Sequence, residues 1–183
     1  MHHGFLHVKT AGVHYFVVHL SPFKWEKRQE EATILLQSIE PLLEAEQSVI
    51  VLGDFNSWSS DDRKWLESDQ NGLLAKKKKS DTQHSHVQNL KGNSFDYEVL
   101  NKFLKSGLAD TAKGHLAETF ASRTTFPTGV FTDKKNAVTI GERIDFILAS
   151  DGLANRVVRF EIPTSGAVNR IADHYPVIVD FKK

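Results

Sequence analysis

Apolar positions near the start of the chain predict two strands. The segments Phe5–Val8 and Val13–Leu20 are rich in β-branched and aromatic residues, and Thr10-Ala11-Gly12 lies between them. A short connection that contains glycine, between two such runs, is typical of a β-hairpin. We therefore expect the two segments to pair as antiparallel neighbours.

The spacing of apolar residues changes after Ser21-Pro22, a dipeptide that favours the start of a helix. From about Lys24 to about Glu44, apolar residues recur three and four positions apart, which predicts an amphipathic helix that packs one stripe on a sheet. Pro41 is expected to kink this helix or to end it early. The four aliphatic residues Val49–Leu52 then predict a short, fully buried strand.

Later segments continue to interleave helices and strands. We expect a short helix around 61–67, a helix over 97–105 that stops before Gly107, and strands at 143–149, 157–162 and 175–181. Residues 69–95 hold few large apolar groups and are expected to form a long loop. Because several neighbouring strands are joined by hairpin-length turns, the pattern favours a mixed or antiparallel α+β fold over a doubly wound parallel sheet.

Length and composition are those of one ordinary globular domain. The chain has 183 residues, 40% of them hydrophobic and 25% charged, and no repeat or linker divides residues 1–183. Lys plus Arg and Asp plus Glu both number 23, so no overall basic field attracts nucleic acid. The absence of cysteine excludes disulfides, thiolate metal sites and thiol nucleophiles.

Nothing in the sequence fixes the compartment. No apolar run approaches the roughly 18 residues that a membrane span needs, and the first twenty residues lack the basic start and apolar block of a signal peptide. We expect a soluble protein, and export stays open because a signal could lie upstream of Met1. The sequence identifies no protein partner.

Polar residues follow or interrupt four strongly apolar segments. These are His19 in VVHLSP, Asp54 and Asn56 in GDFN, Asp145 in RIDFIL, and Asp173 and His174 in ADHYPV. Each segment alone is weak, since GDFN also fits an ordinary turn. Together, in this order and each joined to a predicted strand, they indicate one shared site at the rim of a sheet.

The four segments resemble the endonuclease/exonuclease/phosphatase superfamily, whose members are similar to deoxyribonuclease I, abasic-site endonucleases and neutral sphingomyelinases. The resemblance runs from about His14 to Phe181. It implies an α+β, deoxyribonuclease I-like four-layer α/β sandwich, with helices outside two packed sheets. It also implies hydrolysis of phosphodiesters or phosphomonoesters that depends on a divalent metal, Mg²⁺ or Mn²⁺.

The chemistry of phosphoester hydrolysis suits these residues. It needs cations where negative charge builds up, and Mg²⁺ requires only one or two carboxylates besides water. Asp54 and Asp173 suit metal binding and polarisation of the attacking water. Asn56 can donate to a phosphate oxygen, and His19 and His174 can offer protons to such oxygens.

The resemblance also pairs the carboxylate of the RID segment with the last histidine. Asp145 would orient His174 and raise its pKa, as the aspartate of a catalytic triad steadies its histidine. A carboxylate within so apolar a segment needs a partner of this kind.

One departure from the family pattern concerns the metal. In the family, a Glu on an upstream strand is the chief metal anchor and an Asn lies further upstream, and this sequence offers no substitute for either. Glu26, Glu30 and Glu31 lie on the predicted helix and do not match. The sequence therefore resembles the C-terminal two-thirds of such a domain, lacking its N-terminal strands. A catalytically silent, truncated module of the same fold is the alternative to a phosphoesterase.

Three further features have two interpretations each. Trp58 suits stacking on a base or sugar and equally suits capping of the core edge. His84 and His86 resemble a metal clip, but contact with substrate from a loop is favoured. The run Lys76–Lys79 could bind phosphates, although a solvated face is favoured.

The substrate stays open among nucleic acid, a lipid head group and a small phosphoester; zero net charge argues mildly against tight non-specific DNA binding.

Overall fold

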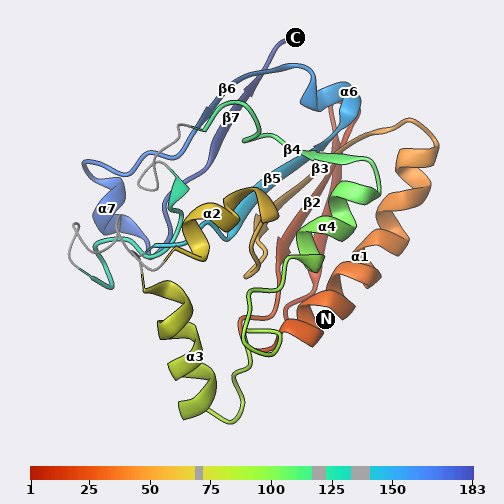
Figure 1. Cartoon of the computed structure of the whole chain (residues 1–183). Coiled ribbons are helices and arrows are strands. Elements are labelled where there is room, and N and C mark those ends of the chain that lie inside the picture. Colours follow the sequence, from red (N-terminus) through yellow and green to blue (C-terminus); the bar gives the residue numbers. More distant parts are fainter. Residues whose placement is uncertain (69–71, 117–122, 133–140) are drawn as a thin grey trace.

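The computed structural model describes residues 1–68, 72–116, 123–132 and 141–183 (Figure 1). Its strands are β1 Phe5–Thr10, β2 Val13–His19, β3 Ser48–Asp54, β4 Leu108–Asp110, β5 Asp145–Ser150, β6 Val157–Glu161 and β7 Ile178–Phe181. Its α-helices are α1 Trp25–Glu44, α2 Arg63–Leu66, α3 Leu73–Gln83, α4 Glu98–Lys105, α6 Asp151–Ala154 and α7 Val168–Ile171, and a 3₁₀ turn at Ser60–Asp62 precedes α2. In this part of the chain no helix is long and apolar enough to cross a bilayer.

The strands form two sheets. The larger sheet has five strands in the order β1-β2-β3-β5-β4, and β6 and β7 form a separate antiparallel pair. Within the larger sheet, β2 and β3 run parallel, while every other pairing is antiparallel. The sheet is therefore mixed, and the predicted α+β class is confirmed.

The first hairpin forms as the sequence predicts. β1 and β2 pair in a register that places Thr10 opposite Val13. The two residues between them, Ala11 and Gly12, have φ angles of 49° and 79°. Positive φ at both central positions matches the right-handed twist of the flanking strands, so this turn fixes the register.

The main core lies between the larger sheet and the helices α1 and α4, which cover one of its faces (Figure 1). Alternate residues of the central strands point into this core, among them Phe16, Val51 and Leu148. The opposite face holds a smaller cluster around Ile50, against which Phe181 of β7 packs. The molecule is thus layered as helices, larger sheet and β6–β7 pair.

Several boundaries differ from the sequence-based expectations. α1 ends at Glu44 as the apolar spacing predicts, and it continues through Pro41, so of the two effects expected of this proline the early end does not occur. Pro41 removes only the N–H that would donate to the carbonyl of Gln37, and it lies after Ile39, the last buried residue of the helix. β5 and β7 begin two and three residues later than expected.

The expected long loop at 69–95 is also wrong, because α3 occupies Leu73–Gln83; residues 69–71 lie outside the described part. Leu, Ala and Lys are strong helix formers, so this segment forms a helix although it holds few apolar residues. The short strand β4 was not predicted, since three residues carry too little periodicity.

Candidate active site

Three neighbouring strands bring polar residues to one edge of the larger sheet. β2 and β3 run parallel and end there, whereas β5 is antiparallel to β3 and begins there. The register places His19 opposite Asp54 and Asp54 opposite Asp145. Three of the segments identified from sequence therefore meet in one row because of strand pairing alone.

The backbone turn at the end of β3 fixes the Asp54 carboxylate. Gly53 has a φ of 132°, and a Cβ there would lie 2.0 Å from the carbonyl oxygen of Val18, so only glycine fits. Asn56 donates from its backbone N–H to Asp54 Oδ1 at 2.7 Å and from Nδ2 to Oδ2 at 3.0 Å. Its Nδ2 also donates to the Leu20 carbonyl at 2.9 Å. Asn56 therefore holds Asp54 in place, and protein acceptors engage its amide hydrogens.

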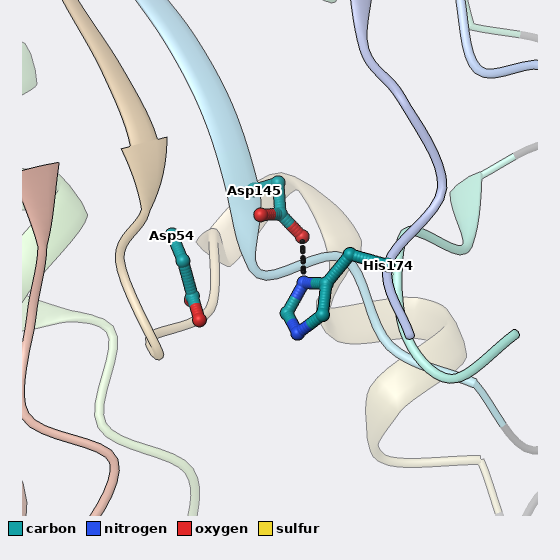
Figure 2. Close-up of side chains that lie close together, drawn as sticks. All are labelled: Asp54, Asp145 and His174. Carbon is teal, nitrogen blue, oxygen red and sulfur yellow. Dashed lines mark hydrogen bonds and ion pairs between the residues drawn. The ribbon is translucent and has the colours of Figure 1, made fainter. Parts of the chain in front are cut away.

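Asp145 and His174 form the pair that the sequence analysis expects. His174 Nδ1 donates to Asp145 Oδ2 at 2.8 Å, which leaves Nε2 on the side of the ring towards Asp54 (Figure 2). Burial alone lowers the pKa of His174, but the hydrogen bond and the negative charge of Asp145, with smaller effects from Asp54 and Asp173, outweigh it and raise the pKa. The pair therefore favours the protonated imidazole more than an isolated histidine would.

Asp54, Asp145 and His174 offer ligand atoms that all lie within 4.8 Å of one another, and their side chains point towards a common space (Figure 2). Burial, and after it the nearby charge of Asp145, raises the pKa of Asp54 to about 7. Two close, half-buried carboxylates are costly without a positive charge between them. Carboxylate oxygens suit both Mg²⁺ and Mn²⁺. The donor set fits a divalent cation.

The other expected site residues lie around this group. Asp173 lines the same cleft but is exposed and is not among the three clustered ligands. His19 Nε2 lies 3.5 Å from Asp54 Oδ2. Burial, followed by the nearby rings of His3 and His174, lowers the pKa of His19. A smaller share of His19 than of His174 is therefore protonated near neutral pH.

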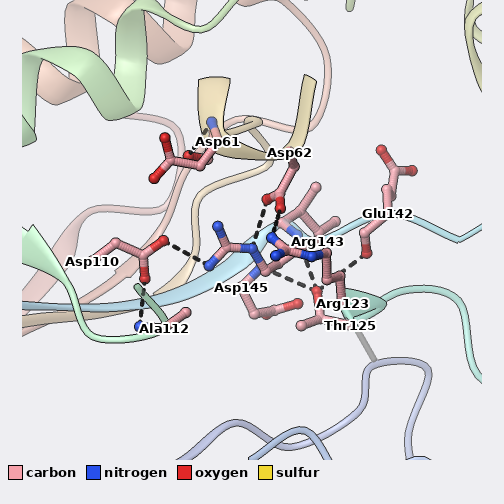
Figure 3. A network of polar contacts seen from close by, with 11 residues as sticks. Asp61, Asp62, Asp110, Ala112, Arg123, Thr125, Glu142, Arg143 and Asp145 are labelled. Carbon is pink, nitrogen blue, oxygen red and sulfur yellow. Dashed lines mark hydrogen bonds and ion pairs between the residues drawn. The ribbon is translucent and has the colours of Figure 1, made fainter. Parts of the chain in front are cut away.

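A buried polar network supports the start of β5 (Figure 3). Arg143 donates from Nε to Asp62 and from Nη1 to Asp110, both at 2.7 Å. Thr125 Oγ1 accepts the backbone N–H groups of Ile144 at 3.0 Å and Asp145 at 3.2 Å.

Thr125 also reaches the segment that carries the last histidine. Its carbonyl oxygen accepts the N–H of Tyr175, the residue after His174, at 2.7 Å. Thr125 thus joins the two segments that carry Asp145 and His174. Sequence reasoning missed it, since no pattern separates it from the neighbouring threonines.

The site opens into a cleft of about 480 Å³. Its lining comprises His19, Pro22, Asp54, Asn56, Lys77, Phe126, Phe131, Glu142, Ile144, Asp145, Asp173 and His174. The sequence pattern drew attention to the run Lys76–Lys79 as a whole, without separating Lys77, and did not single out Glu142. The signals were present, since Glu142 precedes the RID segment and Lys77 follows Leu73 and Leu74 at helical spacing.

Trp58, His84 and His86 are not in the lining of the cleft. Trp58 is 1% exposed and packs in a core cluster, so its ring caps the core edge and is not available for stacking on a substrate. His84 and His86 are exposed at the end of α3, with ring centroids 6.0 Å apart.

Comparison with known proteins identifies the family. A family model described as Endonuclease/Exonuclease/phosphatase family matches residues 2–174. No curated protein matches significantly in sequence.

Solved structures with the same fold are distant in sequence. The 3′ phosphatase NExo from Neisseria, bound to a product DNA hairpin, has a TM-score of 0.67 and 18% identity, covering 98% of this chain and 65% of that one. An AP endonuclease from Archaeoglobus fulgidus has a TM-score of 0.61 and 20% identity, with coverages of 98% and 65%. The mannosyl-6-phosphatase Bt3783 from Bacteroides thetaiotaomicron has a TM-score of 0.53 and 17% identity, with coverages of 93% and 51%.

The chain thus spans 65% of the length of the first two of these structures. The similarity shows the deoxyribonuclease I-like fold that the sequence resemblance implies. Since the family model matches nearly the whole chain, this protein belongs to the Endonuclease/Exonuclease/phosphatase family.

Proposed function

We propose that this chain forms the catalytic side of a divalent-metal-dependent hydrolase of phosphoester bonds. The observation that carries the proposal is the convergence of Asp54, Asp145 and His174, whose ligand atoms lie within 4.8 Å of one another at the floor of a cleft. We also propose that residues 1–183 fold as a single domain, which a single cooperative unfolding transition would test.

The three residues have separate roles in this proposal. Asp54 and Asp145 would hold Mg²⁺ or Mn²⁺, which when bound supplies a Lewis acid for the phosphate oxygens. Asp54 would also polarise the attacking water. Asp145 keeps the imidazole of His174 oriented and protonated through the 2.8 Å hydrogen bond. His174 then donates from Nε2 to a phosphate oxygen as charge builds up.

Three further residues near the site assist Asp54, Asp145 and His174. Asn56 keeps the Asp54 carboxylate in place. His19 contacts Asp54 at the mouth of the cleft, and in its neutral form it can orient a water or a phosphate oxygen. Asp173, which also lines the cleft, would help to hold the cation.

The substrate class is a phosphomonoester or a phosphodiester. The structural neighbours include a phosphatase with a DNA product, an AP endonuclease and a sugar phosphatase. Nucleic acid is therefore a candidate substrate, but equal numbers of basic and acidic residues do not favour tight non-specific binding of a polyanion.

Metal-dependent turnover tests the proposal directly. We expect the chain to hydrolyse p-nitrophenyl phosphate or bis-p-nitrophenyl phosphate with Mg²⁺ or Mn²⁺, to lose activity with EDTA, and to lose it in H174A. The variant H84N is the matched control, because His84 is exposed and not in the lining of the cleft. If the metal binds and no phosphoester is cleaved, the chain is the catalytically silent module and the proposal is wrong.

A further inference from the structure

One lysine of the run Lys76–Lys79 differs from the other three. Lys76, Lys78 and Lys79 are exposed on α3, whereas the side chain of Lys77 is 19% exposed and lines the cleft. Lys77 follows Leu73 and Leu74 at helical spacing, and these two leucines face the core cluster around Trp58. The inward face of α3 therefore directs a single ammonium group into the cleft.

The position of Lys77 is fixed from two directions. Its Nζ lies 2.7 Å from Glu142 Oε1 and 5.2 Å from the centroid of the Trp58 ring. Glu142 is in turn held by the indole N–H of Trp58, which donates to Oε2 at 2.7 Å.

The helix itself is anchored at both ends. Leu73 is buried in the core cluster at its start, and near its end Asp81 accepts the N–H groups of Asn89 and Leu90, both at 2.9 Å. An ammonium held in this way loses little further side-chain entropy when it binds a ligand.

The charge of the cleft shows what Lys77 can bind. Four carboxylates line it, those of Asp54, Glu142, Asp145 and Asp173, and Lys77 is the one Lys or Arg among its described lining residues. A cleft with this excess of negative charge repels phosphate unless cations offset it. Lysine has three N–H donors, and Glu142 Oε1 is a partner for one of them.

We propose that Lys77 is a substrate-binding residue of this cleft, one that contacts a non-bridging oxygen of the bound phosphate and favours a phosphomonoester dianion over a phosphodiester monoanion. The inference rests on the proposed function for its substrate, but phosphate binding can be measured without turnover. A second unit of negative charge on the ligand strengthens attraction to a fixed ammonium. Lys77 therefore sets substrate preference, while Asp54 and His174 carry the chemistry.

A purely structural role for Lys77 as the counterion of buried Glu142 makes different predictions. Removing the ammonium alone leaves a carboxylate that is 4% exposed without its cation, so K77M can fail through instability. The double variant K77M/E142Q removes both charges and keeps an acceptor for the Trp58 N–H. The variant E142Q keeps the Lys77 ammonium and removes the negative charge beside it.

The test combines calorimetric binding of inorganic phosphate with steady-state kinetics on the whole chain. Relative to wild type, we expect K77M/E142Q to weaken phosphate binding and to raise KM for p-nitrophenyl phosphate by roughly tenfold or more. The loss for bis-p-nitrophenyl phosphate should be smaller. E142Q should bind phosphate at least as tightly as wild type, and K76M should match wild type.

Two results would overturn the inference. One is wild-type phosphate affinity and KM in K77M/E142Q, which would make Lys77 a counterion only; the other is an equal loss on both substrates, which would remove the preference. If wild type cleaves neither substrate but K77M/E142Q still weakens phosphate binding, the proposed function fails and the anion site stands. If wild type is active and K77M/E142Q behaves as K76M does, the proposed function stands and this inference fails.

Discussion

The strand-end side of the cleft and its α3 side hold their polar groups by different means. On the first side, His19, Asp54 and Asp145 are neighbours because three strands pair in one register. On the second, Lys77 meets Glu142 only because a helix packs against Trp58. The strand-end groups cannot move apart without breaking the pairing of the strands. The Lys77–Glu142 pair, in contrast, can be substituted without disturbing the sheet. We infer that the strand ends carry the reaction and that α3 adjusts what is bound.

The largest expected effect is on turnover, from removing the Asp54 charge. We expect D54N to lower kcat by roughly 10³-fold or more, because water activation and metal binding both depend on this carboxylate. The matched control is D61N, since Asp61 is exposed and lies outside the cleft. Equal activity of the two variants in Mg²⁺-dependent hydrolysis would contradict the assignment of the chemistry to the strand ends.

The next effect concerns the turn that presents Asp54. G53A should lower the free energy of unfolding by about 3 kcal/mol or more, because its Cβ would lie 2.0 Å from the carbonyl oxygen of Val18. G152A is the control, as no atom lies within 4 Å of a Cβ at Gly152. Denaturant unfolding measures both variants, and similar losses in the two would show that the turn does not need glycine.

A smaller effect is expected at Thr125, which joins the Asp145 and His174 segments. T125V removes the acceptor of two N–H groups, which should cost roughly 2 kcal/mol of unfolding free energy and lower kcat more than it changes KM. T125S keeps the hydroxyl and should restore kcat. If T125S is as inactive as T125V, the methyl group rather than the hydrogen bonds positions these segments.

The two sides of the cleft also differ in how well the sequence predicts them. Asp54, Asp145 and His174 were identifiable because each lies in a short motif beside an apolar strand, and the apolar pattern that marks a strand is local in the sequence. Lys77, Glu142 and Thr125 act through contacts between segments far apart in the chain, which periodicity does not report. The sequence signal of α3 is weak for a related reason, since its single inward face buries little apolar surface. Trp58 had two interpretations, and only its burial decided between them.

The smallest expected effect concerns the exposed histidines of the predicted substrate loop. His84 and His86 are exposed and do not line the cleft. We expect H84N/H86N to leave kcat/KM on p-nitrophenyl phosphate within about twofold of wild type. A larger loss on this small substrate would extend the binding surface beyond the described cleft.

The central claim is that Asp54 and its neighbours form a cation site, and metal binding by calorimetry tests it most directly. Asp54 has a pKa of about 7, above its ordinary value of 3.8, so the folded chain binds more protons than the unfolded chain between these values. The raised pKa of Asp54 therefore makes the metal-free fold less stable as pH rises from about 3.8 to about 7. Below about pH 7 a cation must displace the proton of Asp54 in order to bind.

We therefore predict that Mn²⁺ binds wild type at one site, more tightly at about pH 8 than at about pH 6, and releases more protons at the lower pH. D54N should lose this binding, and D61N should keep it. Binding to D54N as tight as to wild type, or no binding to wild type at either pH, would contradict the account.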